Sequence, residues 1–119
     1  MKKPGARQLA EKRGRRAETI AAWWLRLHGW RILARRVRTH WGEGDLIARR
    51  GRIVAFVEVK ARGSTFDLTQ AIDERRLKRV AAAASALAPR YLRARDDMRI
   101  DVILVGSGLP KHLANVRLG

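Results

Sequence analysis

Three charged side chains, Asp45, Glu58 and Lys60, stand in two neighbouring segments that are otherwise mostly apolar. Because side chains alternate across a strand, Glu58 and Lys60 would share one face. Two carboxylates that meet one cation offer the hard oxygen ligands that suit Mg²⁺. Such an ion polarises a phosphodiester and activates a water for in-line attack, and a nearby lysine stabilises the charge that builds on the phosphate oxygens. The trio is therefore a candidate site for phosphodiester hydrolysis.

A predicted hairpin carries these residues. Two runs rich in β-branched residues, 45–48 and 53–61, flank a glycine, which favours a tight turn between two strands. A two-residue loop at 50–51 would place Asp45 diagonally across from Glu58, at about 7–8 Å between backbone positions. Side chains at that separation converge, so one cation would contact both carboxylates.

The rest of the chain supplies helices and further strands. The pattern predicts a helix over about 12–28, a strand over 30–38, a turn at 40–44, a long helix capped by Asp67 with Gln70, a strand over 99–105 and an edge strand within 112–118. Val80, Ala84 and Leu87 would form the buried stripe of the second helix with Ile72, and Pro89 would end or kink it. The order α, β, β, β, α, β predicts an α/β protein with a mixed sheet flanked by helices.

The chain is strongly basic, with 27 Lys and Arg against 11 Asp and Glu and a formal net charge of +16 over 119 residues. Basic surfaces gain affinity for polyanions by releasing counterions from phosphates, so nucleic acid is the first candidate partner and an acidic membrane surface the second. Residues 1–13 are expected to form a basic arm or the first turns of a helix. The length suits one domain over 1–119.

Several classes of protein are disfavoured by composition. With no cysteine there is no disulfide framework and no thiolate metal site. No apolar run approaches the roughly 20 residues that span a bilayer, and no phosphate-binding GxxxxGK motif is present. We expect a cytoplasmic protein that does not cross a membrane, and association with the nucleoid is compatible with this expectation.

The hairpin sequences GEGDLIA and FVEVKAR resemble those of the PD-(D/E)XK nuclease superfamily. The likeness is closer to the YraN family of predicted endonucleases, which look like archaeal Holliday-junction resolvases. It runs from about Gly14 to Asp101, and its motifs in order are AETIAAWWL, GW, GEGDLI, VEVK and RIDV. The resemblance implies a restriction-endonuclease-like core.

The same resemblance implies roles for individual residues. Asp45 and Glu58 would bind a divalent metal ion, Mg²⁺ or Mn²⁺, and Lys60 would be catalytic. Glu18 on the first helix would be an auxiliary metal ligand or active-site carboxylate. Glu43 would lie just behind these ligands.

Contacts with nucleic acid are expected around the hairpin. The candidates are Arg38, His40, Trp41, Arg62, Arg75, Arg76 and Arg79. Arginines bind backbone phosphates, and an exposed tryptophan stacks on bases. The chain departs from the family's pattern at Arg76, where a lysine is usual, and at Arg36, where an asparagine is common.

We therefore predict a metal-dependent endonuclease-like protein that hydrolyses phosphodiester bonds in DNA, with branched or structured DNA as candidate substrates. A homodimer is compatible with the resemblance, because a four-way junction has two symmetric strands to cut. One alternative is a non-catalytic nucleic-acid-binding module that retains the nuclease fold, and another is a basic protein that stabilises a ribonucleoprotein or a membrane-associated assembly. The site residues also have alternatives without function. Asp45 or Glu58 would pair with Lys60 on a solvated strand face, and Glu18 would form a salt bridge with an arginine.

Overall fold

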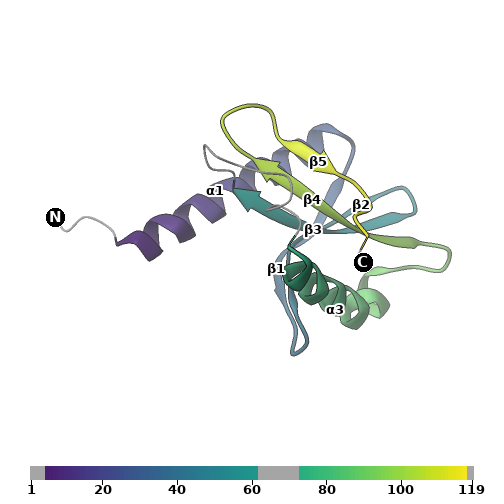
Figure 1. The fold of residues 1–119 in the computed structure, drawn as a ribbon. Helices are drawn as coiled ribbons and strands as arrows, with labels where there is room; N and C mark the ends of the chain where they lie inside the picture. Colours follow the sequence, from purple (N-terminus) through teal and green to yellow (C-terminus); the bar gives the residue numbers. More distant parts are fainter. Residues whose placement is uncertain (1–4, 62–72, 118–119) are drawn as a thin grey trace.

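The structure, a computed structural model, describes residues 5–61 and 73–117. Its elements are α1 (Ala6–Leu27), β1 (Arg31–Arg38), β2 (Glu43–Arg50), β3 (Ile53–Ala61), α3 (Glu74–Tyr91), β4 (Asp97–Val105) and β5 (Lys111–Leu113) (Figure 1). The α/β class, the order of the elements and the short edge strand near the C-terminus agree with the prediction. Neither described helix is long and apolar enough to span a bilayer.

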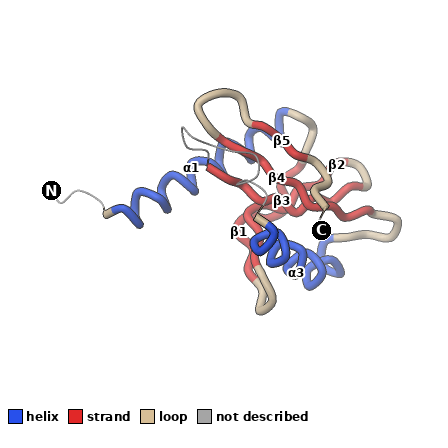
Figure 2. Tube along the Cα trace, viewed as in Figure 1, coloured by secondary structure: helices blue, strands red, loops and turns tan. Residues whose placement is uncertain are grey.

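The five strands form one mixed sheet in the order β1-β2-β3-β4-β5 (Figure 2). The pair β3 and β4 is parallel, and the other neighbouring pairs are antiparallel. A parallel pair needs a crossover connection, and α3 lies in that connection. On β2, Leu46 and Ala48 pack in a core with α1 residues, whereas Ile47 packs in a core with α3 residues. The two helices therefore cover opposite faces of the sheet.

Helix α1 packs on the sheet through its second half. Ala17 and Leu25 are buried, whereas the described side chains before Ala17 are exposed or half-buried. The first turns of α1 extend away from the sheet (Figure 1). Residues 6–13 are thus the start of a helix, and the helix begins earlier than predicted. The sequence of residues 6–13 mixes charged and small residues and shows no clear apolar stripe that would mark it as helical.

The register of the β2–β3 hairpin differs from the prediction. Arg50 pairs with Ile53 and Leu46 with Val57, so the loop is 51–52 rather than 50–51. Gly51 has a φ of 61° and takes the first loop position, where a two-residue type II′ turn also prefers glycine. Continued by one residue, this register sets Asp45 directly across from Glu58 rather than diagonal to it.

Strand β1 also departs from simple alternation. Its pairing with β2 shifts between Ile32 and Ala34. Ile32 packs in the core that contains α1, whereas Leu33 and Ala34 both pack in the core that contains α3. The alternation of Trp30, Ile32 and Ala34 with Arg31, Leu33 and Arg35 predicts a strand with one mostly buried face, and this prediction is wrong, because the irregularity moves the later residues to the opposite face.

Helix α3 begins at Glu74 and is capped by Asp73. The Asp73 carboxylate accepts hydrogen bonds from the backbone N–H groups of Arg75 and Arg76 at 3.0 and 3.4 Å. The predicted cap at 67–70 lies outside the described residues.

The predicted apolar stripe of this helix is largely confirmed. Val80 and Ala84 are buried and Leu87 is half-buried, while Ile72 lies outside the described residues. Pro89 lies in the last turn rather than at the end, because the helix continues to Tyr91.

The turn between β1 and β2 is pressed against α3. A Cβ atom on Gly42 would lie 1.9 Å from the carbonyl oxygen of Arg79, so only glycine fits without moving the helix. We predict that Gly42→Ala lowers the free energy of unfolding by about 1–3 kcal/mol, as overpacking does. Gly108→Ala is the matched control, because a Cβ there has no neighbour within 4 Å. Denaturant unfolding measures both variants, and equal stabilities would contradict the close contact.

Candidate functional site

A cavity of about 440 Å³ opens at the edge of the sheet where β1 and β3 end and β2 begins. Its walls come from α1, three strands and α3. The lining residues are Glu11, Gly14, Arg15, Glu18, Arg36, Arg38, Asp45, Val59 and Arg76. A second hollow of about 270 Å³ shares several of these residues and adds Val37, Glu43 and Gly44. Carboxylates and guanidinium groups thus meet around one concave surface.

Asp45 and Glu58 form a carboxylate pair beside this cavity. Asp45 accepts a hydrogen bond from the backbone N–H of Val59 at 2.8 Å, just beyond the backbone pair of Leu46 and Val57. Glu58 is 4% exposed. The two carboxyl groups are close enough for each to affect the ionisation of the other. Both side chains lie on the face of the sheet that α3 covers, and the prediction that they share one face is confirmed.

This pairing changes the acidity of both groups. The pKa of Glu58 is raised from 4.5 to about 7. Burial is the main cause, and the negative charge of Asp45 is the second. Burial likewise raises the pKa of Asp45, and the charge of Glu18 adds to the effect. A buried carboxylate pair favours either a shared proton or an added cation.

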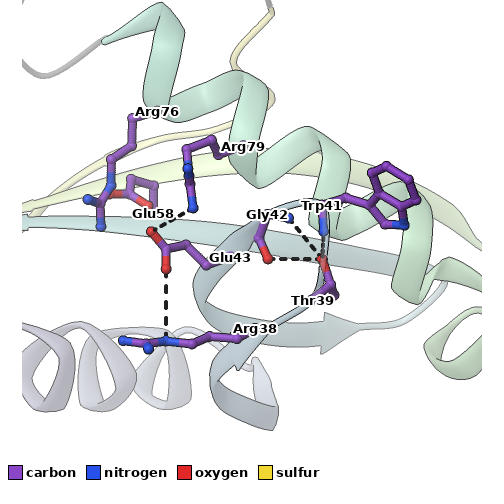
Figure 3. A network of polar contacts seen from close by, with 8 residues as sticks. All are labelled: Arg38, Thr39, Trp41, Gly42, Glu43, Glu58, Arg76 and Arg79. Carbon is purple, nitrogen blue, oxygen red and sulfur yellow. Dashed lines mark hydrogen bonds and ion pairs between the residues drawn. The ribbon is translucent and has the colours of Figure 1, made fainter.

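Arg76 supplies one cation to this pair. Its Nε donates a hydrogen bond to Glu58 Oε1 at 2.5 Å, and Figure 3 shows it reaching from α3 toward Glu58. The positive charge of Arg76 lowers the pKa of both Glu58 and Asp45, though less than burial raises them. Arg76, predicted as a nucleic-acid contact, therefore also acts as the counter-ion of the site.

Glu18 lies across the cavity on α1. Its side chain is 12% exposed, and its Oε1 accepts a hydrogen bond from Arg36 Nε at 3.1 Å. The salt-bridge alternative for Glu18 is thus observed, while Glu18 and Asp45 still line the same cavity. Arg36 has a φ of 51°, a left-handed conformation that costs about 1–3 kcal/mol outside glycine. Backbone strain of this kind is common at functional sites. No role of Arg36 in the site was predicted from the sequence.

Lys60 stands apart from the cavity. It follows Glu58 on the same face of β3, as predicted, and is half-buried. It is not among the residues that line either hollow. Within residues 5–61 and 73–117, no salt bridge joins Lys60 to Asp45 or Glu58, so the alternative of a face paired through Lys60 is not observed there.

Glu43 links the two sides of the site. Its Oε2 lies 3.9 Å from Nε of Arg38 on β1, and its Oε1 lies 3.7 Å from a terminal guanidinium nitrogen of Arg79 on α3 (Figure 3). Glu43 also lines the second hollow. Its predicted place behind Asp45 is compatible with this position. The structure therefore brings Arg38 and Arg79 to the rim of the site.

The remaining predicted contacts are more scattered. Trp41 is 70% exposed, and the ring of His40 packs against it at 5.1 Å. Arg75 is exposed and lines neither hollow. Arg62 lies outside the described residues.

Asp101, from the RIDV motif, is fully buried in a different place. It accepts hydrogen bonds from Arg99 and from the backbone N–H of Asn115, and its Oδ2 lies 2.6 Å from His112 Nε2. Burial opposes its ionisation, but these hydrogen bonds outweigh burial and lower the pKa of Asp101. Its role is to fix the chain after β4.

The described residues contain no group of three or more His, Cys, Asp or Glu arranged to hold a metal ion. The acidic residues of the site are instead a close pair, Asp45 and Glu58, with Glu18 held separately by Arg36. Sequence reasoning also missed Arg15 in the cavity wall, although its place one turn before Glu18 on a predicted helix could have indicated it.

Comparison with known proteins places these residues in a family. Residues 17–105 match the family described as Uncharacterised protein family UPF0102. A UPF0102 protein of Sphingopyxis alaskensis is 62% identical over 111 residues, which cover 92% of this chain and 96% of that protein. UPF0102 proteins of Rhizorhabdus wittichii and Erythrobacter litoralis are 62% and 57% identical and also cover 92% of this chain, with 94% and 95% of their own lengths. The resemblance to the YraN family is thereby confirmed.

The acidity of the carboxylate pair gives a pH-dependent stability in buffer free of divalent cations. Because folding raises the pKa of Glu58 from 4.5 to about 7, the folded state holds a proton that the unfolded state releases between these values. The free energy of unfolding should therefore fall as the pH rises from about 4.5 to about 7. Asp45→Asn removes the negative charge beside Glu58 and should make this fall smaller by on the order of 1 kcal/mol.

Denaturant unfolding at several pH values between 5 and 8 measures this difference. Asp97→Asn, an exposed residue at the start of β4, is the control and should follow the wild type. If the Asp45→Asn and wild-type profiles ran parallel, the two carboxyl groups would not be coupled.

Proposed function

The chain belongs to the protein family UPF0102, and from this premise we propose that it is a divalent-metal-dependent nuclease that hydrolyses phosphodiester bonds in DNA. The choice of DNA rests on the resemblance of its motifs to those of Holliday-junction resolvases. The mixed sheet with a helix on each face is compatible with a restriction-endonuclease-like core.

One observation carries the proposal: buried Glu58 lies beside half-buried Asp45, and Asp45 lines a cavity together with several arginines. Burying two carboxylates together is costly unless a cation joins them. Arg76 contacts one oxygen of Glu58, and Val59 contacts one oxygen of Asp45. Among residues 5–61 and 73–117, these hydrogen bonds use Asp45 Oδ2 and Glu58 Oε1 and leave Asp45 Oδ1 and Glu58 Oε2 for another ligand.

These oxygens fit a hard divalent cation. Asp45 and Glu58 would hold Mg²⁺ or Mn²⁺, with Glu18 available from the opposite wall after it leaves Arg36. When bound, the ion would polarise a phosphodiester and lower the pKa of a bound water. The proposal does not require Glu18 as a third direct ligand.

The chain's own cations would bind the substrate. Arg36, Arg38 and Arg76 line the cavity, where their guanidinium groups would bind phosphate oxygens and orient the scissile bond. Lys60 has a long flexible stem, and it would move toward the cavity to stabilise charge on the reacting phosphate. These groups would convert a basic surface into an oriented binding site for one phosphodiester.

A second candidate function is a nucleic-acid-binding module without catalysis. The ion pairs of Arg76 with Glu58 and of Arg36 with Glu18 favour it, because Glu58 and Glu18 already have counter-ions. In that case the arginines would still bind phosphates, and neither Asp45 nor Glu58 would matter for binding.

Cleavage assays distinguish the two functions. The wild type should cleave at least one of labelled duplex, single-stranded, flap and four-way-junction DNA in the presence of Mg²⁺ or Mn²⁺. Asp45→Asn and Lys60→Ala should each reduce the rate by about 100-fold or more, the loss that follows removal of one charge-stabilising group. Lys111→Ala on the edge strand β5 is the control and should retain activity.

Binding without cleavage, with the same affinity in the wild type and in Asp45→Asn, would contradict the nuclease and support the binding module. A steep decrease of affinity with salt would accompany that result.

A further inference from the structure

Trp41 is the exposed aromatic residue closest in sequence to the cavity-lining residues of β1 and β2. Its side chain lies in the turn between these strands and is 70% exposed. The other exposed large apolar residues in the described part of the chain are Ile20, Trp23, Leu27, Met98 and Leu109, none of which is in this turn. Among the described residues, Trp41 is thus the one exposed large apolar side chain of its turn, where it follows Thr39 and His40.

The turn that carries Trp41 is held in one shape. The Thr39 hydroxyl accepts hydrogen bonds from the backbone N–H groups of Trp41 and Gly42 at 3.1 and 2.9 Å (Figure 3). The same hydroxyl donates to the Gly42 carbonyl oxygen at 2.9 Å, and the Thr39 backbone N–H donates to that oxygen at 2.7 Å. Gly42 is also pressed against the backbone of α3. An aromatic ring on a fixed turn loses little conformational entropy when it binds.

Two cations lie near this turn, on the same side of it as Glu43 (Figure 3). Arg38 precedes it on β1, and Arg79 lies on the part of α3 that Gly42 touches. Both side chains are largely exposed, and Glu43 holds them on either side of itself (Figure 3). Each guanidinium keeps further N–H donors for phosphate oxygens. A ring that stacks on a base, beside cations that bind the backbone, is the composition of a single-strand binding site.

We propose that the turn of residues 39–42 is a binding site for an unpaired nucleobase, which stacks on Trp41 while Arg38 and Arg79 bind its phosphates. This site deepens the proposed function, on which it rests, because Arg38 also lines the cavity that holds Asp45. A strand would pass from the cavity to the turn. A continuous duplex keeps its bases stacked on one another, so the site selects DNA with unpaired bases, such as single strands, flaps and opened junctions.

Binding of fluorescently labelled DNA, measured by anisotropy in EDTA at one fixed salt concentration, tests this site without cleavage. The ligands are a single strand, a duplex with splayed single-stranded arms and a blunt duplex. Trp41→Ala should weaken binding of the first two by about 5- to 100-fold, the loss of one base–aromatic stack, and should leave binding of the blunt duplex within about twofold of the wild type. Trp41→Phe should restore part of the loss, because a smaller ring still stacks.

Trp23→Ala is the matched control, since Trp23 is 58% exposed and lies on α1 rather than in the turn. It should bind all three ligands as the wild type does. Equal affinities of Trp41→Ala and wild type for the single strand, or an equal loss for all three ligands, would overturn the inference and leave the nuclease proposal in place. If the wild type bound none of the three ligands, both the base-binding site and the nuclease proposal would be overturned. A selective loss together with no metal-dependent cleavage would retain the site and contradict only the nuclease.

Discussion

The burial of two carboxyl groups against each other, those of Asp45 and Glu58, is the constraint on which the site depends. Glu58 is 4% exposed, and burial raises the pKa of both groups. Such a pair persists only because neighbouring elements offset its cost. The backbone of β3 donates to Asp45 through Val59, and α3 supplies Arg76 to Glu58. The capping of α3 by Asp73 and its packing on the sheet therefore serve to deliver a cation to the end of β3.

The surrounding fold places acidic and basic groups on both sides of the cavity. Glu18 comes from α1, and the strained backbone at Arg36 accompanies an ion pair with it. On the other side, Gly42 lets the β1–β2 turn approach α3 so closely that Glu43 lies between Arg38 and Arg79. Acidic and basic groups thereby alternate along one concave surface, as a site must do if it is to bind both a cation and the phosphate that the cation attracts.

Much of this arrangement could be predicted from the sequence, because strong local patterns determine it. The alternation of Phe56, Glu58 and Lys60 with Val57 and Val59 assigned the faces of β3, and the apolar stripe of α3 was predicted at Val80 and Ala84. The hairpin register was wrong by one loop position, since Gly51 fits either position of a two-residue loop and only the observed pairing distinguishes them. The ion pairs of Arg36 with Glu18 and of Arg76 with Glu58 were not predicted, because 27 cations offer too many equivalent pairings for 11 acids. Lys60 lies outside the cavity wall, and the spacing of residues along a strand does not specify which of them line a cavity.

The central claim is that Asp45 and Glu58 together form a cation site. The most direct measurement is an anomalous diffraction map of crystals grown with Mn²⁺, since it locates the ion without any assay of activity. The account predicts a peak within about 2–2.5 Å of carboxylate oxygens of both Asp45 and Glu58. A map with no peak between them, in which Arg76 still holds Glu58, would contradict the claim and leave the carboxylates as an internal ion-pair network.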